Sequence, residues 1–343
     1  RCTKFKYVFL TGHHSFFMAC LLSAVLGTAD MKGIELILSG GFLLGAWSAI
    51  SPAIGQRYTN RVTEGDGIAM GHFGSLAYYI SAWVGSKVGD AKDSTEKIEI
   101  PEKWGFLRDT TVSTAITMMF FYLLAAVAAG PTYVGTLSGG MSPFLFALMA
   151  GLKFAVGVTI VYSGVRMILG DLIPAFEGIA TRVIPNAVPA VDCAVFFTYA
   201  PTAVVIGFVA SFIGGIIGML LLGVAGSVLI IPGLVPHFFC GATAGIFGNA
   251  TGGRRGAAIG AFVNGLLISF TPALLLPVLG ALGFQNTTFG DFDFGVLGIA
   301  LGSLSGAWGK AGIFAILAPF PIVLLLPNFI HTEGKVINNP DEE

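Results

Sequence analysis

Imidazole and carboxylate side chains stand inside apolar stretches of this chain. The five residues are His13, His14, His72, Asp192 and His237. An ionisable side chain in hydrocarbon is costly, and it persists where it is paired or functional. Imidazole nitrogens and carboxylate oxygens together supply the hydrogen-bond donors and acceptors that a small hydroxylated ligand needs. We therefore expect such a ligand at Asp192, His13 and His72, with structural hydrogen bonding as the alternative for each.

Five further positions are weaker candidates for the same site. His14 and His237 fit a ligand site and a packing histidine about equally well. An aromatic wall for the ligand is expected from Phe73, Phe196 or Phe197.

The composition predicts an all-α, polytopic membrane protein. Of the 343 residues, 55% are hydrophobic and only 11% are charged, whereas a soluble domain has about 25% charged residues. The 48 glycines and 29 phenylalanines fit membrane helices that pack closely through small residues. A net charge of −1 without a long basic run argues against nucleic acid as a partner.

One transmembrane domain over residues 1–343 is expected, embedded in a lipid bilayer with about eight membrane segments, where one crossing takes about 20 residues. These segments are residues 7–27, 33–54, 112–130, 143–169, 202–224, 257–282, 294–304 and 312–326. Residues 89–109 are rich in both charges and are expected to form a solvated loop, and 328–343 to form a polar tail.

Three further segments, near 64–88, 185–199 and 230–250, are broken by glycine, proline and polar residues. Irregular backbone at membrane depth is tolerated where it is packed in protein or lines a watery cavity, and in transporters such segments form the substrate site. Two of them place His-Phe shortly after a glycine and aliphatic residues, at His72 and His237, which predicts an internal repeat.

Motifs of enzymatic chemistry are missing from the sequence. It contains no phosphate-binding loop, no His-Glu-x-x-His and no nucleophile elbow. Cys2, Cys20, Cys193 and Cys240 have neither metal-site nor disulfide spacing and are expected to be small buried hydrophobes. We therefore expect no catalytic residue, metal or cofactor, and any phosphoryl chemistry must come from a partner protein.

Six motifs, in order along nearly the whole chain, resemble the ascorbate-specific IIC component (EIIC) of the bacterial phosphotransferase system (PTS). They are Leu10-Thr-Gly-His13, Ile68-Ala-Met-Gly-His72, Leu107-Arg-Asp-Thr-Thr-Val-Ser, Ala190-Val-Asp192-Cys-Ala, Tyr199-Ala-Pro-Thr-Ala-Val-Val-Ile-Gly-Phe and Ile230-Ile-Pro-Gly-Leu-Val-Pro-His-Phe-Phe. Members of this family are longer at the N-terminus, so the resemblance implies that the first helices precede Arg1.

The resemblance implies a sugar transport component of the inner bacterial membrane, working as a homodimer by an elevator mechanism. L-ascorbate would be taken up and phosphorylated by the EIIB component, which is recharged through EIIA and HPr, so the phosphoryl chemistry lies outside this chain. By position, the substrate contacts carry over to His13, His72 and Asp192. The loop 89–109 and the Arg254/Arg255 turn are the expected EIIB docking surface.

Two positions depart from the family pattern. Phe17 and Phe73 stand where an ascorbate transporter of the family has glutamine. Because a ring cannot replace an amide that contacts a substrate hydroxyl, a related sugar acid or polyol is an alternative ligand. Two other functions stay open: an ion-coupled symporter with Asp192 as proton carrier, and a non-transporting membrane remnant or sensor.

Overall fold

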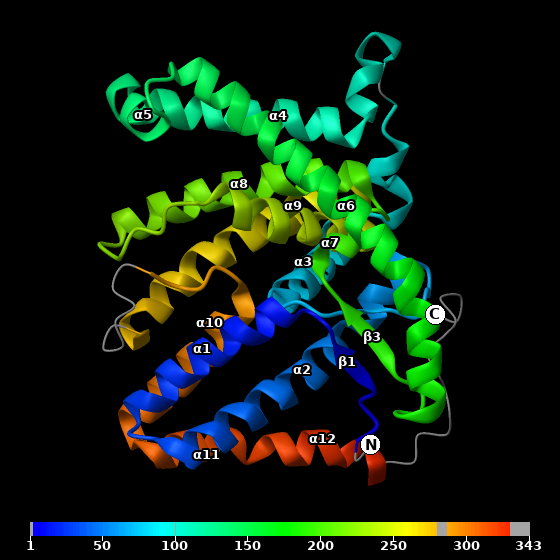
Figure 1. Ribbon diagram of the computed structural model, residues 1–343, viewed down its shortest axis with the longest axis vertical. Helices are drawn as coiled ribbons and strands as arrows, with labels where there is room; N and C mark the ends of the chain where they lie inside the picture. The colour runs from blue at the N-terminus through cyan, green and yellow to red at the C-terminus, as the bar shows by residue number, and fades with distance from the viewer. Residues whose placement is uncertain (1–2, 100, 280–286, 330–343) are drawn as a thin grey trace.

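The computed structural model describes residues 3–99, 101–279 and 287–329 (Figure 1). Helices dominate it, which confirms the all-α membrane class. Six helices in the described ranges are long and apolar enough to cross a membrane: Gly33–Thr63, Thr111–Ala129, Pro143–Val165, Pro201–Val224, Leu234–Leu279 and Lys310–Asn328. The expected number of about eight segments stays a prediction, and residues 330–343 of the expected tail lie outside the described residues.

One helical layer, at the bottom of Figure 1, combines both ends of the chain. It consists of α1 (Gly12–Thr28), α2 (Gly33–Thr63), α10 (Phe292–Trp308), α11 (Lys310–Leu317) and α12 (Pro319–Phe329). Their inward faces form a hydrophobic core together with the last turns of α9.

The central layer contains α3 (Ser75–Val88), α8 (Pro201–Val224) and α9 (Leu234–Leu279) around a second hydrophobic core. Helix α9 is bent into a hairpin at Gly253, whose φ of 57° is in the left-handed region that glycine adopts readily. Both arms of the hairpin pack on α8 through glycines, so the three helices approach one another closely.

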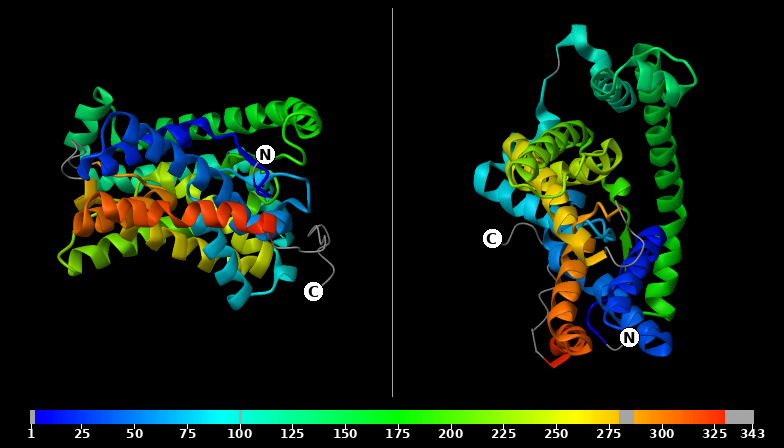
Figure 2. Two further views of the ribbon diagram at one scale, coloured as in Figure 1. Left: turned by 90° about the horizontal axis from the view of Figure 1, so that it is seen from below. Right: turned by 90° about the vertical axis from the view of Figure 1, so that its left-hand side faces the viewer.

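The third layer is formed by α4 (Thr110–Ala129), α5 (Pro131–Ser138) and α6 (Pro143–Arg182). Helix α6 is 40 residues long and runs along one side of the molecule over most of its height (Figure 2, right). It connects the upper layer in Figure 1 to the strand that follows it.

Two of the three expected broken segments meet in a small parallel sheet. Strand β3 (Val188–Val191) lies between β1 (Tyr7–Phe9) and β2 (Ala69–Met70) and is followed by the short helix α7 (Cys193–Phe196). The sheet provides hydrogen bonds to backbone that is not helical, as membrane depth requires. Because β1 pairs with β3, the helix expected from Tyr7 begins only at Gly12.

The solvated loop after α3 is tied to the hairpin of α9. It contains the 3₁₀ turns Ala91–Asp93, Thr95–Lys97 and Glu102–Arg108. The Thr95 amide donates to Asn249 Oδ1 at 2.8 Å, and the Arg254 guanidinium donates to the carbonyls of Ser94 and Lys97. The first part of the loop is therefore a fixed surface.

Close glycine contacts between α3 and α9 give a stability prediction. A Cβ at Gly252 would lie 2.1 Å from the carbonyl oxygen of Gly85. We expect Gly252→Ala to lower the unfolding free energy in detergent by about 1–3 kcal/mol, because neither backbone can give way. Gly45→Ala is the control, since a Cβ there meets nothing within 4 Å. Equal thermal melting of the two variants would contradict this packing.

Candidate functional site

A cluster of ionisable side chains lies where the two hydrophobic cores meet and where several elements begin. His13 and His14 stand at the start of α1, and His72 lies between β2 and α3. Asp192 is the N-cap of α7, and Asp291 is the N-cap of α10. The small sheet positions the first four, because β1, β2 and β3 directly precede these helices.

The distances show two imidazole–carboxylate pairs in contact with each other. His13 Nε2 is 3.6 Å from Asp192 Oδ2, and His14 Nδ1 is 3.6 Å from Asp291 Oδ2. The ring centroid of His14 is 4.5 Å from that of His13 and 3.8 Å from that of His72. The side chains of His13 and Asp192 are 59% and 32% exposed, whereas His14 and His72 are buried. A ligand would therefore enter at His13 and Asp192.

Hydrogen bonds fix the tautomer of His72. Its Nδ1 accepts from the Gly74 amide at 3.0 Å and lies 2.9 Å from the Tyr78 hydroxyl. Because an amide can only donate, Nδ1 carries no proton, and the proton of the neutral ring is on Nε2. His72 thus offers an N–H donor to a ligand.

This tautomer also bears on metal binding. Two groups of side chains have ligand atoms within 4.8 Å of one another, His14 with His72 and Asp291, and His72 with Asp192 and Cys193. A metal needs an unprotonated ring nitrogen. Since the lone pair on Nδ1 of His72 is occupied and Nε2 is protonated, neither group suits a metal.

The charge states of His72 and Asp192 follow from burial and from the neighbouring groups. Both residues lie outside the six candidate spans. Burial lowers the pKa of His72 to about 4, so this ring is neutral at pH 7. Burial alone would raise the pKa of Asp192, but His72, the Cys193 hydrogen bond, His14 and His13 together hold it below its usual value. The cluster therefore combines a neutral donor with an ionised acceptor.

Three other positions singled out in the sequence, His237, Phe73 and Phe17, differ in how they relate to the cluster. His237 contacts Ser211 Oγ at 2.9 Å and packs edge-on against Phe212, both on α8, as a packing histidine would. Phe73 is fully buried, stacks on Phe9 and lies behind His14, with ring centroids 5.9 Å apart. Phe17 is 47% exposed.

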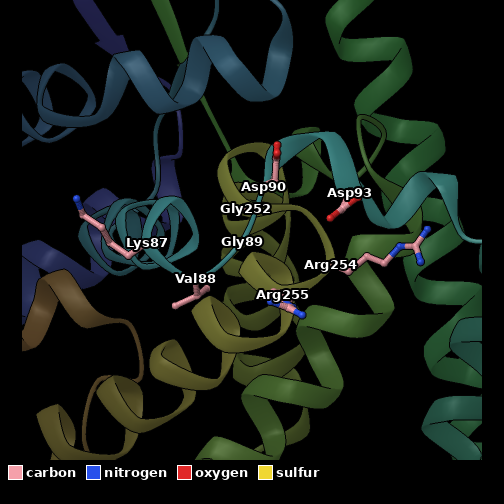
Figure 3. A pocket seen from close by; sticks show the side chains of 8 residues that line it. All are labelled: Lys87, Val88, Gly89, Asp90, Asp93, Gly252, Arg254 and Arg255. Atoms are coloured by element: carbon pink, nitrogen blue, oxygen red, sulfur yellow. The ribbon is translucent and has the colours of Figure 1, made fainter.

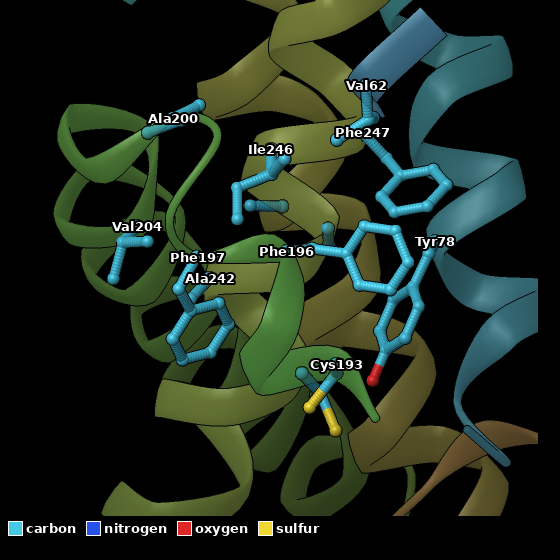
Figure 4. Packing of buried hydrophobic residues seen from close by; sticks show 14 of the residues in the cluster. Val62, Tyr78, Cys193, Phe196, Phe197, Ala200, Val204, Ala242, Ile246 and Phe247 are labelled. Carbon is cyan, nitrogen blue, oxygen red and sulfur yellow. The ribbon is translucent and has the colours of Figure 1, made fainter. Parts of the chain in front are cut away.

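Sequence reasoning missed Asp291, Tyr78 and the polar contact of Cys240, whose thiol donates to Asp291 Oδ1 at 2.9 Å. Cys193 and Cys240 are buried, as expected, whereas Cys20 is half-buried and Cys2 lies outside the described residues. Figure 4 shows the Tyr78 ring beside Phe196, with its hydroxyl directed toward the end of α7 that carries Cys193. Asp291 stands between Gly290 and Phe292 and could have been found by the signal that singled out Asp192, a carboxylate in apolar surroundings.

Asp293 is a second missed carboxylate, fully buried in the first turn of α10. It accepts from Ser75 Oγ at 2.9 Å, from the Leu76 amide at 3.1 Å and from Trp47 Nε1 at 3.3 Å. Asp293 thereby fixes the start of α3, and with it the turn that carries His72.

The family model of the PTS system sugar-specific permease component, EIIC-GAT, matches residues 1–293. The chain belongs to this family. The ascorbate-specific PTS system EIIC component of Mycoplasma pneumoniae is 25% identical over 386 residues, covering all of this chain and 54% of that protein. The chain thus spans about half the length of the curated relative that it matches.

Membership in the EIIC-GAT family confirms the resemblance found in the six motifs. Together with the six candidate spans, it identifies a multi-pass membrane protein of the PTS permease type. The name of the Mycoplasma pneumoniae relative assigns ascorbate to that protein.

Proposed function

We propose that this chain is the part of a PTS permease that binds and moves L-ascorbate, or a related hydroxylated sugar acid, across the bacterial inner membrane. EIIB phosphorylates the transported substrate. The observation that carries the proposal is the cluster of His13, His14, His72, Asp192 and Asp291 between two apolar cores. No other group of imidazoles and carboxylates this dense occurs among the described residues.

The chemistry of the cluster suits an acidic, hydroxylated ligand. His72 offers an N–H donor, and Asp192 accepts from hydroxyl groups. The first turn of α1 also faces the cluster and has no side-chain cap. In α10, by contrast, the first-turn amide of Asp293 already donates to the Phe73 carbonyl. Free amides at helix N-termini favour the negative charge that L-ascorbate carries at neutral pH.

The two phenylalanines at expected glutamine positions act differently from each other. Phe73 supports the rings of the cluster from its buried side, and Phe17 is exposed on α1. Neither offers a hydrogen bond to a substrate hydroxyl. This is the reason that related sugar acids are included in the proposal.

The distribution of basic residues gives the proposed orientation. Arg57 and Arg61 lie near the end of α2 that is linked to α8 by the hydrogen bond from Tyr199 to Asp66. Six further basic residues lie at the same end: Lys87, Lys92, Lys97, Lys103, Arg254 and Arg255. At the opposite end, Lys32 and Lys310 are the basic residues of the described helices and turns. The positive-inside rule places the basic end in the cytoplasm.

EIIB is proposed to dock at this basic end. A cleft of about 670 Å³ is lined there by Lys87, Asp90, Asp93, Arg254 and Arg255 (Figure 3). Its walls are the fixed loop after α3 and the hairpin of α9, so the surface can receive a folded partner without first ordering. The homodimer and the elevator mechanism belong to the same proposal, through the resemblance to EIIC proteins.

The experiment uses membrane vesicles with the full chain, EIIB, EIIA, the general PTS proteins and labelled L-ascorbate. We expect labelled ascorbate phosphate only when phosphoenolpyruvate is added. Accumulation of unmodified ascorbate driven by an ion gradient would instead identify a symporter. No uptake and no phosphate under any condition would favour the remnant or sensor.

Tyr78 should tune ligand affinity through His72. We expect Tyr78→Phe to weaken ascorbate binding about 2–10-fold, the effect of one neutral hydrogen bond. Tyr79→Phe is the control, because Tyr79 packs against Tyr58 and Phe247. Binding is measured by equilibrium dialysis, together with the ¹⁵N shifts of the His72 ring. Equal affinities for both variants would show that the Tyr78 hydroxyl has no positioning role.

A further inference from the structure

The side chain of Asp291 is turned away from the helix that it precedes. Asp291 is the N-cap of α10, and an aspartate at this position normally stabilises its helix by accepting from the amides of the first turn. The Asp291 carboxylate forms no such bond. The first-turn amide of Asp293 donates to the Phe73 carbonyl at 2.9 Å instead. Asp291 thus gives up a stabilising contact, and another role must account for its position.

The thiol of Cys240 holds this carboxylate from one side. Cys240 is buried in the first arm of α9, and its thiol donates to Asp291 Oδ1 at 2.9 Å. The Tyr78 hydroxyl contacts the same thiol and lies 2.9 Å from His72 Nδ1. Asp291 is therefore fixed to the central layer next to the groups that fix His72.

The second oxygen of the Asp291 carboxylate faces the cluster. Oδ2 is 3.6 Å from His14 Nδ1 and has no hydrogen-bond donor among the residues that the structure describes. His14 Nδ1 accepts from the Phe73 amide at 3.4 Å, so this nitrogen is an acceptor as well. The side chain of Asp291 is 20% exposed. Oδ2 is therefore a free acceptor that a ligand can reach.

His72 lies close to both carboxylates of the cluster. Its ring has a nitrogen within 4.8 Å of a carboxylate oxygen of Asp291, and also within 4.8 Å of one of Asp192. The hydrogen bonds of the His72 ring in the described structure go to Gly74 and Tyr78, not to either carboxylate. A small ligand that accepts from the His72 Nε2–H group therefore has two carboxylate acceptors within reach.

The charge of these acceptors decides which groups of an acidic substrate they meet. L-ascorbate has its negative charge on the enediol of its ring, and its side chain has two neutral hydroxyl groups. A carboxylate repels the enediol anion and accepts hydrogen bonds from hydroxyl groups. The two carboxylates therefore suit the two side-chain hydroxyl groups. The uncapped first turn of α1 is left for the enediol.

We infer that Asp291 is a second hydroxyl acceptor of the substrate site and that Cys240 is its positioning residue. This inference rests on the proposed function. One side-chain hydroxyl group of the substrate binds at Asp192 and the other at Asp291. The site then selects small acids with two neutral hydroxyl groups, because a substrate with only one leaves a carboxylate without a partner.

The first test is equilibrium binding of L-ascorbate, and of two analogues that each lack one side-chain hydroxyl group, to the full chain. We expect Asp291→Asn to weaken L-ascorbate binding about 10–100-fold, the effect of a lost hydrogen bond to a charged group. For one of the two analogues, parent and variant should bind about equally, because the hydroxyl group that Asp291 contacts is already missing. The same effect for all three ligands, or none, would overturn the inference.

The second test concerns Cys240. Cys240→Ala removes the donor to Asp291 and should weaken L-ascorbate binding about 2–10-fold, whereas Cys240→Ser keeps a donor and should bind within about twofold of the parent. In the Asp291→Asn background, Cys240→Ala should have no further effect. Cys20→Ala is the control, since Cys20 is a half-buried thiol on α1. A loss that serine does not restore, or that persists in Asp291→Asn, would show that Cys240 does not act through Asp291.

These outcomes can be told apart from a failure of the proposed function. Suppose that the parent binds L-ascorbate and Asp192→Asn does not, while Asp291→Asn treats all three ligands alike. The proposed function then stands, and Asp291 is not a hydroxyl acceptor. A parent that binds no L-ascorbate overturns both.

Discussion

Replacing Asp192 by Asn should reduce ascorbate uptake by the full chain about a hundredfold or more. The carboxylate is the acceptor next to His13, at 3.6 Å, on the exposed side of the cluster. A site built to accept hydrogen bonds from substrate hydroxyls loses discrimination and affinity when its acceptor becomes an amide. Uptake is measured in vesicles as phosphoenolpyruvate-dependent accumulation of label.

The fold should survive this change. Asp192 caps α7 through its bond to the Ala194 amide, and asparagine caps helices about as well as aspartate. We therefore expect the thermal melting of Asp192→Asn to match that of the parent. The matched control is Asp30→Asn, a carboxylate exposed on the turn between α1 and α2, which should transport normally. Normal uptake by Asp192→Asn would remove this residue from the substrate site.

Replacing Asp293 by Ala should have the largest effect on stability. Its carboxylate accepts from three groups on two helices, and the side chain is fully buried. Removal leaves three donors without partners and opens a cavity, which we expect to lower the unfolding free energy by about 3–5 kcal/mol. Ascorbate binding should fall with it, because the start of α3 positions His72.

Asp293→Asn is the matched variant, since it keeps one acceptor oxygen and the volume of the side chain. Its loss of stability should be clearly smaller than that of Asp293→Ala. Thermal melting in detergent, with the yield of monodisperse protein, measures both. If Asp293→Ala melts like the parent, the carboxylate does not hold α3 and α10 together.

Much of this architecture could be predicted from local sequence. Long apolar stretches predicted α2, α4, α8 and the second arm of α9, because a membrane crossing leaves a length and composition signal. The first arm of α9 was expected as a broken segment near 230–250, whereas it is helical from Leu234. Ionisable residues in such surroundings also singled out His13, His72 and Asp192, which the structure brings into one cluster. For His237, the sequence left two interpretations, and its contacts on α8 fit the packing one.

The parts that could not be predicted depend on contacts between distant segments. The strand Tyr7–Phe9 is as apolar as the helix after it, and only its pairing with β3 makes it extended. Asp291 and Cys240 are 51 residues apart, and their hydrogen bond leaves no local pattern.

The most direct test of the central claim is high-affinity binding of labelled L-ascorbate to the purified full chain. Parent, His72→Ala, Asp192→Asn and His237→Gln would be compared, each with a melting curve. The cluster predicts saturable high-affinity binding to the parent and to His237→Gln, and its loss in His72→Ala and Asp192→Asn without loss of folding. High-affinity binding that persists in folded His72→Ala and Asp192→Asn would show that the substrate site lies elsewhere.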